Sequence, residues 1–151
     1  AYQPIGAGVS DVAIGAPMGL FSGSRPADLG LAGGKLRGGD GRPNWVSSQV
    51  SPADAHHIAP LPVAGDPGLA WRALEAAVRA ERGARVVTLR PGYLHAEFSS
   101  KSMGFVDDAE FALDRDAGLI HVRSGARLGI RDFGANRERI ERLRAAVPKR
   151  P

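Results

Sequence analysis

The chain has 151 residues, of which 43% are hydrophobic, 24% charged and 6% aromatic, and this length allows one ordinary domain rather than two well-cored ones. Twenty glycines and eleven prolines argue against a compact helical bundle, and the lack of cysteine excludes disulfides, thiolate metal sites and thiol nucleophiles. The formal net charge is +4. Since no apolar run approaches the ~20 residues that cross a bilayer, the sequence predicts no transmembrane segment.

Residues 1–42 hold eleven of the twenty glycines, scattered among short apolar islands without helical or alternating periodicity. We expect an extended leader, not a domain, that gains order only by lying on its own domain or on a partner. A disordered leader is the alternative. As a partner-binding arm, it would serve a protein partner, with membrane-associated proteins among the candidates.

Residues 43–151 have the composition and hydrophobic pattern of a single globular domain. The segment 57–61 is predicted as a short strand, restricted by its proline to an edge or a strand end. Asp66 and Pro67 are typical of a helix start, with aspartate as the N-cap and proline at the first helical position. An apolar stripe then continues to about Gly83.

Four strands and a helix complete the predicted domain. The strands cover residues 85–90, 93–99, 105–113 and 119–128, with a turn at 114–118 between the last two, and the helix covers about 134–147. The order strand, helix, four strands, helix predicts an α+β fold. We expect a two-layer sandwich, in which an antiparallel sheet carries both helices on one face.

Alternation places a row of polar side chains on the sheet face opposite the helices: Tyr93, His95, Glu97, Asp108, Glu110, His121, Arg123 and Arg127. Mixed charges on adjacent strands most often form cross-strand pairs that keep an open sheet soluble. The alternative is a face for a ligand or a protein partner, made by Glu97, Asp108, Glu110, His121, Arg123 and Arg127.

Asp107 breaks the apolar pattern of the row that should face the helices. A buried carboxylate needs hydrogen-bond donors, and a four-residue turn would place Ser124 opposite it. The start of the last helix supplies further donors. We predict a structural latch of Asp107, Ser124 and Asn136 between hairpin and helix, with a buried general base as the alternative.

Other polar groups give weak signals for catalysis or metal binding. Ser47 and Ser48 with the adjacent His56 and His57 invite a serine-hydrolase interpretation, but no G-x-S-x-G elbow is present. Adding Asp54 suggests a metal cluster, yet adjacent residues on an extended segment point to opposite faces. The sequence therefore predicts no catalytic residue, no metal site and no cofactor.

Arginines recur along the last predicted helix, at positions 137, 139, 142 and 144. Glu138 and Glu141 compensate their charge at helical spacing, which is typical of a solvated helix surface. A nucleic-acid face would be basic without such compensation and interleaved with aromatic residues. We therefore expect no nucleic-acid partner.

Four sequence blocks are similar in order and spacing to one known family. They are Pro43–Gln49, Gly104–Phe111, Val122–Gly129 and Asp132–Arg137, and the likeness covers roughly residues 29–147. These blocks resemble the PNCVSSQ, GFVDDVEF, VRSASRxG and DxGxNR signatures of the bacterial and plastid domain-of-unknown-function family numbered fourteen ninety-nine. The resemblance implies no activity, since the family's name records that none was assigned.

The resemblance also carries one difference and one expectation about location. The family commonly places cysteines where this chain has Trp45 and, about six positions earlier, Gly39. If these cysteines form a disulfide in relatives, their joint loss is what one expects.

Relatives often carry a lipoprotein or membrane-anchor signal, which implies an envelope location. The start at Ala1 without Met agrees with an exported protein whose signal peptide has been removed, and a trimmed end is the alternative.

These observations favour a non-catalytic, exported accessory or interaction module associated with a protein complex of the cell envelope, in the periplasm or otherwise outside the cytoplasm. An enzyme is the less favoured class. The alternative function is a small-ligand-binding protein or a hydrolase that uses the polar sheet face, with Glu97, Asp108, His121 and Arg123 as its nearest constellation.

Overall fold

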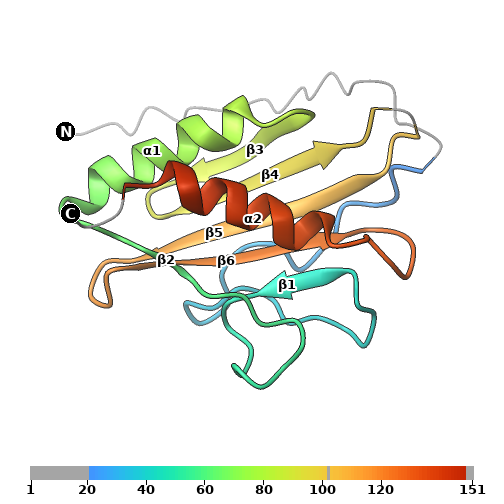
Figure 1. Ribbon diagram of the computed structural model, residues 1–151, viewed down its shortest axis with the longest axis horizontal. Helices are drawn as coiled ribbons and strands as arrows, with labels where there is room; N and C mark the ends of the chain where they lie inside the picture. The colour runs from blue at the N-terminus through green and yellow to red at the C-terminus, as the bar shows by residue number, and fades with distance from the viewer. Residues whose placement is uncertain (1–20, 102, 149–151) are drawn as a thin grey trace, which may run out of the picture.

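A computed structural model describes residues 21–101 and 103–148 of the chain. Its elements are β1 (Trp45–Ser47), β2 (Leu61–Pro62), α1 (Pro67–Ala80), β3 (Ala84–Arg90), β4 (Tyr93–Ser99), β5 (Val106–Asp114), β6 (Leu119–Ala126) and α2 (Ala135–Ala146). The strands form one antiparallel sheet of six strands in the order β1-β6-β5-β4-β3, with β2 also pairing with β6 (Figure 1). The predicted α+β class with an antiparallel sheet is therefore confirmed.

The element order differs from the prediction ahead of the first helix. Two short strands precede α1 instead of one, and the predicted strand at 57–61 is wrong except for Leu61. His57 makes only an isolated parallel bridge to Ser47. The prolines at 60 and 62 have no N–H to donate, so a longer ladder cannot form here.

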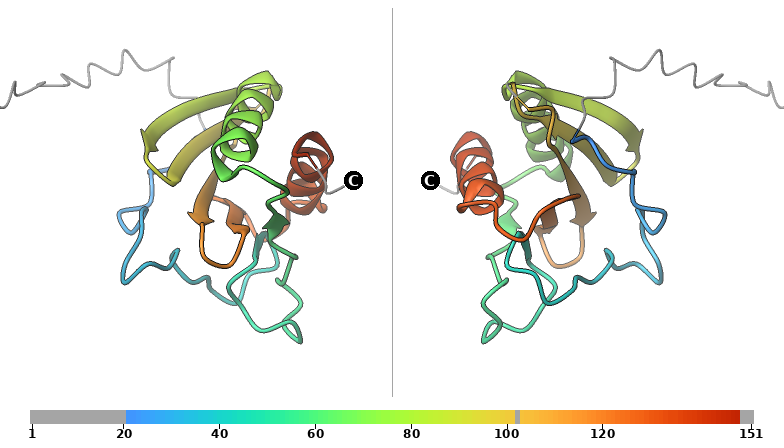
Figure 2. Two further views of the ribbon diagram at one scale, coloured as in Figure 1. Left: turned by 90° about the vertical axis from the view of Figure 1, so that its left-hand side faces the viewer. Right: turned by 90° about the vertical axis from the view of Figure 1, so that its right-hand side faces the viewer.

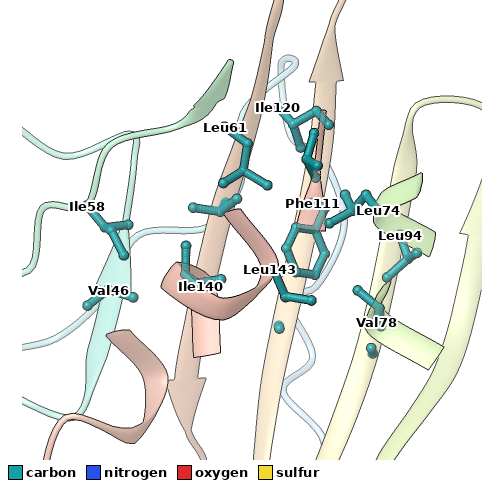
Figure 3. Packing of buried hydrophobic residues seen from close by; sticks show 14 of the residues in the cluster. Val46, Ile58, Leu61, Leu74, Val78, Leu94, Phe111, Ile120, Ile140 and Leu143 are labelled. Atoms are coloured by element: carbon teal, nitrogen blue, oxygen red, sulfur yellow. The ribbon is translucent and has the colours of Figure 1, made fainter. Parts of the chain in front are cut away.

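The hydrophobic core lies between the sheet and the two helices. Helix α1 contributes Ala70, Leu74 and Val78, which follow one another at helical spacing, and α2 contributes Ile140 and Leu143. Alternate residues of the strands meet them from one face of the sheet, with Leu94, Phe111, Ile120 and Val122 at 0% exposure (Figure 3). Figure 2 shows both helices on this side of the sheet.

Helix α1 begins as its sequence indicates. The Asp66 side chain accepts a hydrogen bond of 2.8 Å from the N–H of Gly68, and Pro67 follows as the first helical residue. This contact satisfies one of the N–H groups that a helix leaves without an intrahelical partner.

We expect Asp66→Ala to lower the free energy of unfolding by about 0.5–2 kcal/mol, because the substitution removes the N-cap acceptor. Asp66→Asn should retain most of the stability, since asparagine caps about equally well. Urea denaturation of the three proteins measures both effects. An equal loss in both variants would assign the stabilisation to the charge instead of the cap.

The latch residues are close together, but the register and the central residue differ from the prediction. Asp107 lies opposite Ala126, and Ser124 lies opposite Ala109. The reason is that the hairpin loop begins after Asp114, one residue later than expected, and this shift moves the register by two residues. A shift of two keeps every side chain on its predicted face.

Arg139 of α2 connects the three predicted latch residues. Its Nη1 donates to Ser124 Oγ at 3.1 Å and to Asn136 Oδ1 at 2.8 Å, and its Nη2 donates to Asp107 Oδ2 at 2.9 Å. Ser124 Oγ also donates to Asn136 Oδ1 at 2.7 Å. The guanidinium lies 4.3 Å from the centre of the Phe98 ring. The latch is therefore a buried polar network beside the core.

The expectation that the arginines of the last helix form a solvated surface is wrong for Arg139, which is 8% exposed. Arg137 and Arg144 also have fixed partners, since they donate to backbone carbonyls of residues 55, 57, 59 and 60. These bonds tie α2 to the irregular segment ahead of β2. Arg142 remains about half exposed and pairs with Glu81.

Candidate functional site

Residues 21–42, which we call the cover segment, lie on the sheet face opposite the helices (Figure 2). Leu36 packs there with Tyr93 and Ala112 in a small apolar cluster. The cover segment has no long regular element, and its backbone forms only an isolated bridge between Ala32 and Lys35. It makes up the second part of the predicted leader 1–42, whose residues 1–20 lie outside the described residues.

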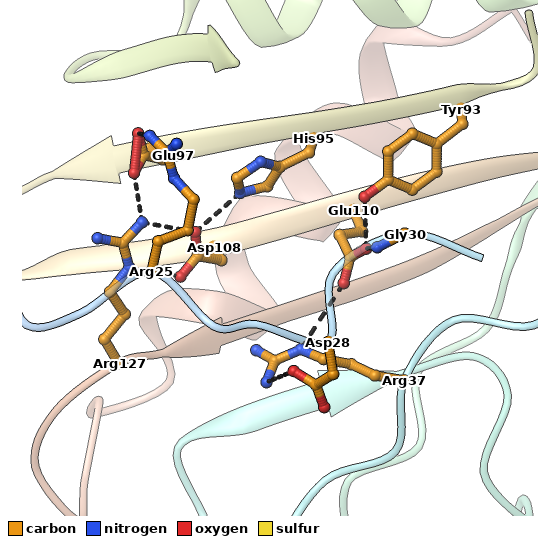
Figure 4. A network of polar contacts seen from close by, with 10 residues as sticks. All are labelled: Arg25, Asp28, Gly30, Arg37, Tyr93, His95, Glu97, Asp108, Glu110 and Arg127. Carbon is orange, nitrogen blue, oxygen red and sulfur yellow. Dashed lines mark hydrogen bonds and ion pairs between the residues drawn. The ribbon is translucent and has the colours of Figure 1, made fainter. Parts of the chain in front are cut away.

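Asp108 is the centre of the first polar cluster beneath the cover segment (Figure 4). Arg127 donates to both carboxylate oxygens of Asp108, at 2.6 and 2.8 Å, and His95 Nε2 lies 2.8 Å from Oδ1. Arg127 also bonds Glu97, which accepts a further hydrogen bond of 2.7 Å from Arg25 of the cover segment. Each carboxylate here therefore has a cationic partner.

Opposite electrostatic effects act on these carboxyl groups. Burial acts to raise the pKa of Asp108, but the hydrogen bonds and charges of Arg127 and His95 outweigh it and lower this pKa to about 2. Burial likewise opposes ionisation of Glu97, while Arg25 and Arg127 lower its pKa. Both groups are held as carboxylates, so neither takes up a proton near neutral pH.

Glu110 is the centre of a second cluster under the cover segment. Its Oε2 accepts hydrogen bonds from the Tyr93 hydroxyl at 2.6 Å and the Gly30 N–H at 2.8 Å (Figure 4). Arg37 Nε lies 3.7 Å from Oε1. Burial and the neighbouring Glu110 raise the pKa of Tyr93. The cover segment is thus anchored through a main-chain donor and two arginines.

The expectation of an open polar face is wrong. Glu97, Asp108, Glu110 and Arg123 lie on one face as predicted, but they are only 9%, 1%, 1% and 5% exposed, because the cover segment lies over them. Alternation along a strand shows which face a side chain takes, but not what covers that face. Glu97, Asp108 and Glu110 therefore offer no free polar surface to a ligand or partner, and Arg123 is accessible only through a hollow beside the cover segment.

The predicted constellation is also dispersed. His121 lies near the hairpin end of the sheet, where its Nδ1 is 3.3 Å from Ser48 Oγ and its Nε2 is 4.0 Å from Asp114. Ser48 Oγ accepts the Val122 N–H at 2.9 Å, which fixes the hydroxyl in the sheet. Arg123 lies instead beside Trp45, with 5.4 Å between its Cζ and the ring centre.

The two adjacent histidines have structural partners. His56 Nδ1 lies 2.7 Å from Asp54 and its Nε2 lies 2.8 Å from the Arg42 carbonyl, while the ring stacks on Trp45 at 3.8 Å. Although burial acts to lower the pKa of His56, these two acceptors raise it. His57 Nδ1 donates to the Val50 carbonyl at 3.1 Å. The described residues contain no group of three side chains suited to a metal ion.

Three arginines essential to these networks were missed by sequence reasoning: Arg25, Arg37 and Arg139. The first two lie in a segment without periodicity, so no pattern assigned them to a face. Charge balance could have indicated them. The strands place three carboxylates on one face, and part of the cations that pair with these carboxylates come from other segments of the chain.

Neither helix in the described ranges is long and apolar enough to span a membrane.

Trp45 packs directly on the cover segment. A Cβ atom at Gly39 would lie 2.2 Å from Cε2 and Cζ2 of the indole, and Trp45 Nε1 donates to the Asp40 carbonyl at 3.0 Å. The two positions at which the resembled family commonly has cysteines are thus in contact in this chain. The Trp45 ring packs against the backbone of Gly39, which has no side chain, and fills the space between the two positions.

We expect Gly39→Ala to lower the free energy of unfolding by about 1–3 kcal/mol, because its methyl group would overlap the Trp45 ring. Gly38→Ala is a matched control, since a Cβ there meets nothing within 4 Å. Thermal or urea denaturation measures the difference. Equal stability of the two variants would show that the Trp45 ring moves at no cost.

The comparisons with known proteins add one match. A family model described as "Protein of unknown function (DUF1499)" matches residues 36–147. No curated protein and no solved structure matches the chain. The matched range includes the sheet, both helices and the last part of the cover segment.

Proposed function

The chain belongs to the family described as protein of unknown function (DUF1499), and from this premise we propose that it is a non-catalytic accessory module that binds a protein partner in the cell envelope. The observation that carries the proposal is the exposed apolar loop between β6 and α2. Burial of the charged sheet face supports the non-catalytic part, and the family resemblance supports the location.

The loop at residues 128–133 exposes three large apolar side chains. Leu128, Ile130 and Phe133 are 39%, 68% and 92% exposed. Phe133 also has a φ of 54°, a left-handed conformation that bulky residues rarely adopt and that costs about 1–2 kcal/mol. Apolar exposure on a strained backbone is typical of a binding surface, and phenylalanine is among the residues enriched at protein interfaces.

The non-catalytic part rests on the carboxylates of the sheet. Glu97, Asp108 and Glu110 accept hydrogen bonds from side chains or backbone of the same chain beneath the cover segment. A general base must reach a proton of the substrate, and these groups face the protein's own donors. The same burial argues against a hydrolase that uses the polar sheet face.

An exported, envelope-associated protein is the expectation carried by the family resemblance, because relatives often have a lipoprotein or membrane-anchor signal. In this proposal the cover segment is a structural layer. The contact with the partner falls to the loop at 128–133, on which the chain's own residues leave Phe133 almost entirely exposed.

A site-specific photo-crosslinker tests the loop. We would place benzoylphenylalanine at position 133 in the native cells, with position 69 on α1 as control, because Leu69 is 58% exposed outside the loop. We expect a discrete protein adduct from position 133 in the envelope fraction and none from position 69.

Three results would contradict the proposal. The same adducts from both positions would indicate unspecific collision, and adducts with lipid alone would replace the protein partner by a membrane surface. Recovery of the protein only in the cytoplasmic fraction would remove the envelope location while leaving the apolar loop as a binding surface.

A further inference from the structure

A hollow of about 420 Å³ opens between the cover segment and β6. Its walls carry four arginines and two aspartates: Arg37, Arg42, Arg123, Arg127, Asp28 and Asp40. Trp45 forms an aromatic wall. The volume lies within the range of small-molecule sites, and the lining charges sum to two positive.

Three of these arginines have carboxylate partners. Arg42 binds Asp40 at 2.8 Å, Arg37 lies 3.3 Å from Asp28, and Arg127 binds Asp108 and Glu97. Arg123 differs from them, because no carboxylate oxygen of the described residues lies within 4.0 Å of its guanidinium. Glu110 lies opposite it on the neighbouring strand, but the carboxylate of Glu110 is directed to Tyr93 and Gly30.

Arg123 is largely buried, but its two terminal nitrogens reach the hollow and have no acceptor among the described residues. The residue is 5% exposed, and only its Nε has a partner among the described atoms, the Gly38 carbonyl at 3.1 Å. Its Nη1 lies directly over Gly125, where an added Cβ would come within 3.0 Å of it. The glycine therefore leaves room for the guanidinium beside Trp45.

A second guanidinium, that of Arg37, faces the same hollow and is paired with Asp28 and Glu110. Arg37 Nε is buried without a hydrogen-bond partner, 3.7 Å from Glu110 Oε1. Burial and the charge of Arg37 lower the pKa of Arg123 to about 10, although the more distant carboxylates of Glu110, Asp28 and Asp108 act to raise it. Of the two arginines, only Arg123 lacks a carboxylate of the described residues within ion-pair distance, and an oxyanion in the hollow would supply acceptors for its terminal nitrogens.

We propose that this hollow binds the oxyanion group, a carboxylate or a phosphate, of a small molecule, with Arg123 as the central donor and Arg37 beside it. The planar fork of a guanidinium matches two oxygens of either group. Asp28 and Asp40 face the same hollow and are neutralised by Arg37 and Arg42. The site is independent of the apolar loop, so either can fail alone.

Thermal denaturation of the full chain with increasing inorganic phosphate or succinate, at an ionic strength held constant with NaCl, tests the proposal. The wild type should show a saturable rise in Tm with at least one probe, and the probe that acts distinguishes phosphate from carboxylate. Arg85→Gln, on the exposed side of β3, should behave like the wild type.

Arg123→Gln should lower the affinity for the probe about tenfold or more, since hydrogen bonds to charged groups contribute that much to binding. In NaCl alone its Tm should equal or exceed that of the wild type, because a largely buried charge without a carboxylate of the described residues in ion-pair contact is removed. Arg123→Lys keeps the positive charge but loses the planar guanidinium, so it should also lower the affinity for the probe.

The proposal is overturned if neither probe gives a saturable rise in the wild type, or if Arg123→Gln retains the rise. A lower Tm of Arg123→Gln in NaCl alone, or its failure to fold, would also overturn it when Arg123→Lys binds the probe like the wild type. Arg123 would then be a structural residue held by Trp45 and Gly38.

Discussion

Asp108→Ala is expected to lower the free energy of unfolding by about 3–5 kcal/mol, the usual cost of removing one partner from a buried ion pair. Asp108 is 1% exposed, and it accepts from Arg127 through both oxygens and from His95. Without the carboxylate, Arg127 keeps only Glu97 as a counter-charge, in a largely buried place. Urea denaturation at neutral pH measures the loss.

Asp116→Ala is the control, since Asp116 is exposed in the hairpin turn and should cost within about 0.5 kcal/mol. On an open sheet face, as the sequence suggested, replacing Asp108 would instead change the free energy of unfolding little. A loss below about 1 kcal/mol for Asp108→Ala would mean that the cover segment does not exclude water from this cluster.

The Asp108 carboxylate also makes the free energy of unfolding depend on pH in the acidic range. Its pKa is about 2 in the folded chain against an ordinary 3.8, so the folded state holds the charged form more strongly than the unfolded chain does. This stabilisation is present above about pH 4 and is lost as the pH falls toward 2, by about 2 kcal/mol. Asp108→Asn should flatten the stability profile over this interval.

Arg139→Ala is expected to lower the free energy of unfolding by about 3 kcal/mol, because it leaves Asp107 as a mostly buried carboxylate without its cation. Burial already raises the pKa of Asp107, even against the attraction of Arg139. Removing the arginine also takes a donor from Ser124 and Asn136 and uncovers the Phe98 ring.

Arg142→Ala on the same helix is the matched control. Its ion pair with Glu81 is half exposed, so the loss should stay below about 1 kcal/mol. Denaturation of both variants compares a buried with an exposed arginine. Because both are changed to alanine in the same helix, the effect on helix propensity is equal. Similar losses for the two would show that the latch does not stabilise the hairpin against α2.

Strand alternation and helix capping carried most of the fold prediction. Leu94, Ala96 and Phe98 alternate with polar neighbours, so the face of β4 that enters the core can be read from the sequence. The Asp66-Pro67 pair marked the start of α1 within one residue. Such signals are local, and each depends on a few consecutive side chains.

The site was harder to predict, because its contacts join distant segments. Arg139 follows Asn136 by three residues and precedes Ile140, so it falls on the buried stripe of α2, yet its neighbouring glutamates suggested a solvent face. The position of Arg25 and Arg37 above β4 and β5 depends on the whole sheet. No local pattern in the cover segment contains that information.

The cover segment also sets an order for the folding of the chain. Its bonds from Arg25 to Glu97, from Gly30 to Glu110 and from Arg123 to Gly38 join residues 72, 80 and 85 positions apart. Contacts this distant in sequence form slowly, since a long loop must close first. The segment precedes in the chain all the strands that it covers, so during synthesis its binding surface is incomplete until β6 has left the ribosome. Until then, three carboxylates of the sheet stay in water, and the nascent protein is more acidic on this face than the native one.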